Sequence, residues 1–298
     1  MTQHLEKANA EQSSAGADAT PVPAVPQPNP AQVPTPRTTC GRMGGMHGGD
    51  TAAGGRGRGR KRIRIAAVAD LHMRESARGR FGPALRESGE HADLLLLAGD
   101  LTDGGTPEEA ELLCAELAGV PVPMAAVLGN HDHDRRQGYR IAAALAATGV
   151  RVLDGTATVF EFGEVRVGVA GVMGGSGGFP GHTGDPDSGS AEHRERYRRG
   201  PADALRLRAA LNCLDTDVRI ALMHFSPVRA TLAGEPVRIL PGLGCAELGA
   251  AADAGRADLV LHGHAHGGVE YGETPGGVPV RNVSYPVIRA PYRVYEVG

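Results

Sequence analysis

The stretch of sequence that decides the fold class is Leu94-Leu-Leu-Leu-Ala-Gly-Asp-Leu-Thr-Asp103. Its first half is an unbroken apolar run, and its second half carries two aspartates behind a glycine. A short continuous apolar run is typical of a strand that is buried on both faces, with helices covering the sheet. We therefore predict a buried strand over Leu94 to Ala98 that ends in a chemically functional turn.

Four other apolar runs end in the same way, in residues that bind metals or transfer protons. They are Ile63 to Ala69, Pro123 to Leu128, Arg219 to Met223 and Asp258 to Leu261. Segments with helical character lie between most of the runs, over Pro83 to His91, Thr106 to Leu117 or Ala118, Gln137 to Ala147, Pro201 to Cys213 and Cys245 to Ala254. This alternation predicts an α/β fold.

Local signals place several element boundaries. Thr106-Pro-Glu-Glu109 combines a capping hydroxyl, a proline at the first helical position and a glutamate that can bond back to the cap. Alternating residues over Thr156 to Phe162 and Val165 to Ala170 predict a β-hairpin that turns at Gly163-Glu164. The stretch from Val269 to Val297 is also strand-like.

The first 60 residues differ in composition from the rest of the chain. They are rich in Pro, Gly and Arg, and a basic run over Arg56 to Arg64 joins them to the rest of the chain. Because this composition cannot bury a core, we predict a disordered N-terminal tail over residues 1–60 and one domain over residues 61–298. The basic run is compatible either with binding to nucleic acid or an acidic surface or with a flexible, solvated junction, and the junction is favoured.

Composition narrows the class of protein further. The chain has 298 residues, of which 41% are hydrophobic, and a formal net charge of −3. That charge gives no global attraction to nucleic acid. No apolar run approaches the roughly 20 residues of a membrane span, and no secretory signal is recognisable. The widely spaced cysteines are predicted to be reduced thiols of a cytoplasmic protein; they are Cys40, Cys114, Cys213 and Cys245.

The polar clusters that follow the five strands should meet in one crevice, because ligand sites collect at the carboxyl ends of strands in α/β sheets. In an extended chain, Asp70 and His72 would project to one side, as would His264 and His266. Glycines allow sharp turns at three of the strand ends, at Gly99, Gly129 and Gly263. Carboxylate, imidazole and amide ligands without thiolate indicate a site for divalent Mn, Fe or Zn.

The five motifs, in this order, resemble the calcineurin-like metallophosphoesterase superfamily. They are Asp70-x-His72, Gly99-Asp-x-x-Asp103, Gly129-Asn-His-Asp132, the lone His224 and Gly263-His-x-His266. The resemblance spans about Ile63 to His266 and implies a four-layer αββα sandwich with two central mixed β-sheets. It implies one metal on Asp70, His72, Asp100 and His266, and a second on Asp100, Asn130, His224 and His264. Asp100 would bridge the two divalent ions.

The resemblance also implies a mechanism. A hydroxide shared by the two metals would attack phosphorus in line. His131 would protonate the leaving oxygen as general acid, and Asp103 would orient its imidazole. Asp132, by contrast, is expected to support the ligands or to be structural. His262 is compatible equally with a supporting or core-packing role and with a functional one.

The motifs point to a substrate class. Gly104 follows Asp103, where the family's protein phosphatases carry arginine. The form Gly-Asp-Leu-Thr-Asp is closer to the cyclic-nucleotide phosphodiesterase and nuclease branches. We therefore predict a phosphodiesterase acting on a small phosphorylated molecule or nucleotide. The alternatives are a DNA or RNA nuclease, and a non-catalytic scaffold of the same fold.

The stretch from Gly174 to Arg199 is a further candidate for function. It is a Gly-rich segment followed by Glu192-His-Arg-Glu-Arg-Tyr-Arg-Arg199. A stretch of this length is compatible with a loop that overhangs the metals and supplies cations to substrate, or with a solvated insertion. The sequence specifies no oligomeric state.

Overall fold

The computed structural model of the protein describes residues 62–298. The predicted disordered tail over residues 1–60 therefore lies outside the described residues. Among the described residues, no helix is both long and apolar enough to cross a membrane.

The first of two large sheets has five strands in the order β13-β1-β2-β3-β4. Its strands are β1 (Ile63–Val68), β2 (Leu94–Ala98), β3 (Met124–Val127), β4 (Arg151–Val152) and β13 (Arg293–Val297). β1 through β4 are parallel, and β13 pairs antiparallel to β1. The sheet is therefore mixed. All five residues of β2 are buried, as its unbroken apolar run predicts.

The second sheet has six strands in the order β11-β12-β10-β9-β6-β5. Its strands are β5 (Thr156–Phe162), β6 (Val165–Val172), β9 (Val218–Met223), β10 (Leu259–His262), β11 (Tyr271–Glu273) and β12 (Pro279–Asn282). The four central strands are parallel, and the two edge strands are antiparallel to their neighbours. β5 and β6 form the predicted hairpin, with Gly163 at a positive φ of 67° in its turn.

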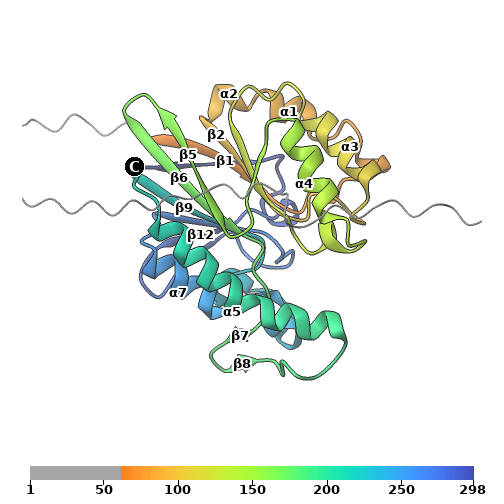
Figure 1. Cartoon of the computed structure of the whole chain (residues 1–298), viewed down its shortest axis with the longest axis vertical. Helices are drawn as coiled ribbons and strands as arrows, with labels where there is room; N and C mark the ends of the chain where they lie inside the picture. The colour runs from red at the N-terminus through yellow and green to blue at the C-terminus, as the bar shows by residue number, and fades with distance from the viewer. Residues whose placement is uncertain (1–61) are drawn as a thin grey trace, which may run out of the picture. The chain divides into compact units, whose positions relative to one another are not determined.

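Helices cover the outer face of each sheet (Figure 1). The first sheet is covered by α1 (Gly82–Arg86), α2 (Ser88–His91), α3 (Pro107–Leu117) and α4 (Gly138–Ala147), and the second by α5 (Ala191–Asn212) and α7 (Ala246–Ala254). One apolar core lies between the two sheets, and one lies between each sheet and its helices. This arrangement confirms the predicted αββα sandwich.

Some predicted helix boundaries differ from the structure. The capping box at Thr106 is confirmed, with both of its hydrogen bonds present. The expected helix over Pro83 to His91 is two short helices, α1 and α2. The expectation that a helix begins at Pro201 is wrong. α5 begins at Ala191, where the Ser190 side chain accepts a hydrogen bond from the main chain of His193.

Pro201 lies in the interior of α5, at the loss of one main-chain hydrogen bond. The helix continues through it because buried residues anchor both halves, with Tyr197 before the proline and Leu207 and Leu211 after it. Short elements complete the chain: β7 (Gly178–Phe179), β8 (His182–Thr183), α6 (Leu240–Leu243) and α8 (Tyr285–Ile288).

Candidate metal centre

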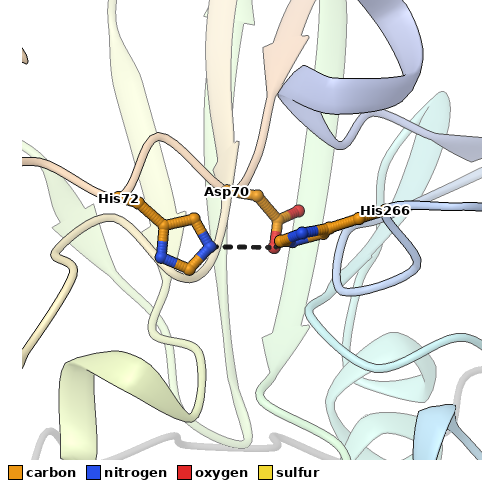
Figure 2. A group of neighbouring side chains, drawn as sticks. All are labelled: Asp70, His72 and His266. Atoms are coloured by element: carbon orange, nitrogen blue, oxygen red, sulfur yellow. Dashed lines mark hydrogen bonds and ion pairs between the residues drawn. The ribbon is translucent and has the colours of Figure 1, made fainter.

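Asp70, His72 and His266 lie together at the carboxyl ends of the strands, although 196 positions in the sequence separate Asp70 from His266. Figure 2 shows the Asp70 carboxylate between the two imidazoles. Oδ1 of Asp70 lies 2.9 Å from Nε2 of His266 and 4.0 Å from Nε2 of His72. The main chain of His264 donates to the other carboxylate oxygen at 3.0 Å. We refer to these three residues as the first cluster.

Asp100, His224 and His264 form a second cluster beside the first. Nε2 of His224 lies 3.2 Å from Oδ2 of Asp100 and 3.2 Å from Oδ1 of Asn130. Nδ1 of His224 bonds to the Ala98 carbonyl at 2.9 Å. Because a carbonyl can only accept, Nδ1 carries a proton, and Nε2 is the nitrogen that faces Asp100.

Asp100 lies between the clusters. The oxygen that is 3.2 Å from His224 is also 4.0 Å from Nε2 of His72. Its other oxygen accepts a hydrogen bond from the main chain of His131 at 2.9 Å. One carboxylate is thus held in contact range of both groups of candidate ligands, which is the geometry that a bridging ligand requires.

The backbone at these positions is unusual. Asp70, His72, Asp100 and His264 all have positive φ, at 58°, 43°, 48° and 69°. Non-glycine residues rarely adopt this left-handed region, and those that do cluster at functional sites. The prediction that Asp70 and His72 project from an extended chain is therefore wrong, as is the shared direction expected of His264 and His266. The turn after β10 places His264 and His266 in different clusters.

The three glycines of the motifs are required mainly for space. A Cβ on Gly129 would collide with the Asp100 carboxylate, and one on Gly263 would lie 2.5 Å from Oδ2 of Asp70. Only Gly99 also has positive φ, at 87°, and its Cβ would lie 2.6 Å from Nδ1 of His224. The carboxylates and this imidazole therefore pack against bare main chain.

Charge at the centre is balanced between buried acids and imidazoles. Burial disfavours the charged form of His224, but the Asp100 carboxylate outweighs burial and raises the pKa of His224 to about 9. Burial likewise opposes ionisation of Asp100, yet His224 holds its pKa below the ordinary value. Burial of Asp70 opposes its ionisation, but the hydrogen bond from His266, together with the charges of His224 and His266, lowers the Asp70 pKa. Both carboxylates are thus ionised and able to bind a cation.

The donor set fits divalent cations. Both ring nitrogens of His72 are buried and make no hydrogen bond with the described residues, although Nδ1 lies 3.3 Å from the Asp103 carboxylate. Burial, together with His224, lowers the pKa of His264 to about 3, so its imidazole is neutral. Within each cluster the candidate ligand atoms lie within 4.8 Å of one another. Neutral imidazole and ionised carboxylate are the forms that bind metals.

His131 lies beside the first cluster, with its ring centroid 4.7 Å from that of His72. Its Nδ1 donates to the main-chain carbonyl of Asp103 at 2.7 Å. The expectation that the Asp103 carboxylate orients His131 is therefore wrong. That carboxylate lies 3.3 Å from Nδ1 of His72 and 3.2 Å from the guanidinium of Arg74.

Two polar residues of the motifs have structural roles, which was expected for Asp132 and left open for His262. Asp132 is fully buried and accepts hydrogen bonds from the main chains of Leu101, Thr102 and Gly129, which ties two site loops together. Burial, reinforced by Asp100, raises its pKa. His262 is also fully buried and bonds through Nε2 to Thr231 at 2.9 Å.

Sequence reasoning missed Phe225 as part of the site. Its ring lies 4.2 Å from the ring of His264 and 5.6 Å from that of His224, so it fixes the orientation of both imidazoles. The available signal was its position directly after His224 in the chain.

The layered fold and the two ligand clusters define a class of metal-dependent hydrolases. Residues 63–268 match the family model of the calcineurin-like phosphoesterases, and the chain belongs to this family. It is a metal-dependent phosphoesterase. No curated protein matches the chain.

Solved structures show the same fold. Phosphopantetheinyl hydrolase from Mycobacterium tuberculosis superposes with a TM-score of 0.54 at 18% identity, covering 76% of this chain and 90% of that one. The protein TT1561 of Thermus thermophilus superposes with a TM-score of 0.55 at 19% identity, covering 80% of this chain and 99% of that one. At these identities the likeness concerns the fold.

Proposed function

We propose that the protein is a binuclear phosphodiesterase that acts on a small phosphorylated molecule or nucleotide. The observation that carries the proposal is the position of Asp100 between two ligand clusters. Asp70, His72, Asp100 and His266 would hold one divalent ion, and Asp100, Asn130, His224 and His264 the other. Such a pair of ions activates water and neutralises charge on the phosphoryl group.

His131 is the proposed general acid. The Asp103 carbonyl fixes Nδ1 as a donor, which leaves Nε2 to carry the transferable proton. Burial lowers the pKa of His131, but the Asp103 carbonyl and the Asp100 carboxylate outweigh burial and leave the pKa above its ordinary value. In hydrolysis, water gives up one proton to solvent and its oxygen bonds to phosphorus as the bond from phosphorus to the leaving oxygen breaks. The leaving oxygen keeps the electron pair and takes the proton from His131.

The substrate class rests on two supports. Gly104 follows Asp103, so the arginine of the family's protein phosphatases is missing from this position. A protein of similar fold is named a phosphopantetheinyl hydrolase. Of the basic run, the described residues Arg62 and Arg64 pair with Glu296 and Asp93, so these two cations are engaged by the domain itself.

The test combines metal analysis with hydrolysis of bis-p-nitrophenyl phosphate. We expect about two metal ions per chain by mass spectrometry, activity that chelation removes, and recovery on addition of Mn²⁺. Asp100→Asn should lose metal and activity while its circular dichroism spectrum stays unchanged. Asp215→Asn, which alters a fully exposed carboxylate, is the matched control and should behave as wild type. Full activity in Asp100→Asn would refute the proposal.

Comparison of hydrolysis rates on different substrates tests the proposed substrate class. Cyclic nucleotides and bis-p-nitrophenyl phosphate should be hydrolysed faster than single-stranded DNA. Faster turnover of the polymer, with a steep dependence on salt, would replace the proposal with the nuclease alternative.

A further inference from the structure

A cavity of about 260 Å³ opens beside the second cluster. Asn130 and His264 form the side of this cavity that faces the metal ligands. His131 does not line it and lies instead against His72 of the first cluster. A phosphoryl group held at the centre would therefore have the proposed proton donor on one side and the cavity on another.

One wall of the cavity carries a free cation. Arg196 and His193 of α5 line this wall. The neighbouring arginines are engaged: Arg194 bonds to the Gly189 carbonyl, Arg198 pairs with Glu195, and Arg199 pairs with Asp203. Arg196, by contrast, makes no side-chain hydrogen bond or ion pair with any residue of the range 62–298. Its charge is available to a ligand.

Another part of the lining is apolar. Ile239 and Leu243, from the segment that leads into and forms α6, line it together with Phe225. No carboxylate lines the cavity in the described part of the chain. The cavity thus presents both a cation and an apolar surface, which suits an anion carried on a carbon framework.

Main-chain contacts hold these two parts of the lining at a fixed separation. The main chain of Ser176 donates to the Arg196 carbonyl at 3.1 Å, and its hydroxyl donates to the Gly242 carbonyl at 3.2 Å. The main-chain N–H of Gly177 donates to the Pro241 carbonyl at 3.1 Å, and that of Gly178 donates to the Gly244 carbonyl at 2.8 Å. The stretch after Gly174 is therefore a strap that joins α5 to α6.

Size determines what the cavity can hold. Complete ligand sites in proteins have volumes of roughly 300–1,000 Å³. The cavity lies below that range, so it fits one substituent of a substrate whose phosphoryl group sits at the ligand clusters.

We propose that this cavity is a specificity subsite for the ester group that stays on phosphorus, and that Arg196 selects a group ending in an anion such as a phosphate or carboxylate. The inference rests on the proposed function. It assigns the leaving group to the His131 side and the retained group to the α5 side. It also gives the Gly174 to Arg199 stretch a role in substrate choice.

Two synthetic diesters with the same leaving group test the inference. They are p-nitrophenyl phenyl phosphate, whose retained group is neutral, and p-nitrophenyl 4-carboxyphenyl phosphate, whose retained group is anionic. Because a charge-assisted hydrogen bond changes affinity about tenfold or more, wild-type kcat/KM should favour the anionic ester by about tenfold. In Arg196→Gln that preference should disappear, chiefly through KM. Arg198→Gln, which alters a paired arginine two residues along α5, should retain it.

The possible outcomes distinguish a failure of the subsite proposal from a failure of the proposed function. Hydrolysis of both esters with the same preference in wild type and Arg196→Gln would overturn the subsite and leave the phosphodiesterase intact. Hydrolysis of neither ester by the metal-loaded protein would refute the proposed function itself. Loss of the preference in Arg198→Gln as well would assign the effect to the general charge of α5, and it too would overturn the subsite.

Discussion

The main-chain carbonyl of Asp103 accepts a hydrogen bond from Nδ1 of His131 at 2.7 Å, while the carboxylate of the same residue lies 3.3 Å from His72. One residue thus contacts the proposed proton donor through its peptide group and a proposed metal ligand through its side chain. These two contacts can be separated by mutation, because only the second depends on the side chain.

We expect Asp103→Ala to weaken metal binding and His131→Ala to slow the chemical step. Removing the Asp103 carboxylate leaves His131 oriented but frees His72, so metal affinity should fall about 10- to 100-fold, with kcat at saturating metal nearly unchanged. Removing the His131 imidazole should lower kcat about 10²- to 10⁴-fold at any metal concentration. Titrations of activity with Mn²⁺ measure both effects.

The pH profile gives a second readout for this pair. A general acid works in its protonated form, so activity should decline as pH rises through the raised pKa of His131. Asp103→Ala should keep this alkaline decline, and His131→Ala should lose it. If the decline disappears in Asp103→Ala, the carboxylate orients His131 after all.

The fold was predictable because its signals are local. β2 is a continuous apolar run buried on both faces, and α3 begins at a capping box, so each is specified by its own few residues. α5 was only half predicted, because a proline that usually starts a helix lies in its interior. Tertiary burial of Tyr197 and Leu207 determines that helix, and a local pattern does not show it.

The candidate site was predictable in its residues but not in its geometry. The motifs named the residues of both clusters. Extended-chain reasoning could not foresee the positive φ of Asp70 and His264, because that conformation depends on packing against distant residues. Main-chain partners such as the Asp103 carbonyl are equally hidden, since every residue has a carbonyl and only the fold decides which one meets an imidazole.

Metal binding should release protons. With its pKa raised to about 9, His224 is protonated in the metal-free protein at pH 7.5, whereas a ligand imidazole must be neutral. Binding at pH 7.5 should therefore release about one proton from His224, and affinity should rise by up to about tenfold per pH unit until pH 9. Calorimetry in two buffers of different ionisation enthalpy measures the release. His91→Gln, at an exposed position of α2, should leave it unchanged, and binding enthalpies that do not depend on the buffer would contradict the prediction.

Asp132→Ala should destabilise the protein through the site loops. The substitution leaves the main-chain donors of Leu101, Thr102 and Gly129 buried without their acceptor. Each such group costs about 1–3 kcal/mol, so the free energy of unfolding should fall by about 3 kcal/mol or more. Urea denaturation of the metal-free protein measures the change. Asp134→Ala, at an exposed neighbouring carboxylate, should cost less than about 0.5 kcal/mol, and equal losses in the two variants would refute the buried role of Asp132.

Gly129→Ala should damage the metal centre by displacing Asp100. The added methyl group would collide with the Asp100 carboxylate and main chain, neither of which can yield without moving the shared ligand. Overpacking of this kind costs about 1–3 kcal/mol, and a misplacement of about 1 Å at a reacting centre can cost about 10²-fold in rate. Gly104→Ala is the matched control, because its methyl group would first meet Glu109 at an ordinary 3.4 Å. Metal content and hydrolysis rate should both fall in Gly129→Ala and stay at the wild-type level in Gly104→Ala. Full metal content and wild-type turnover in Gly129→Ala would show that Asp100 does not depend on the bare main chain beside it.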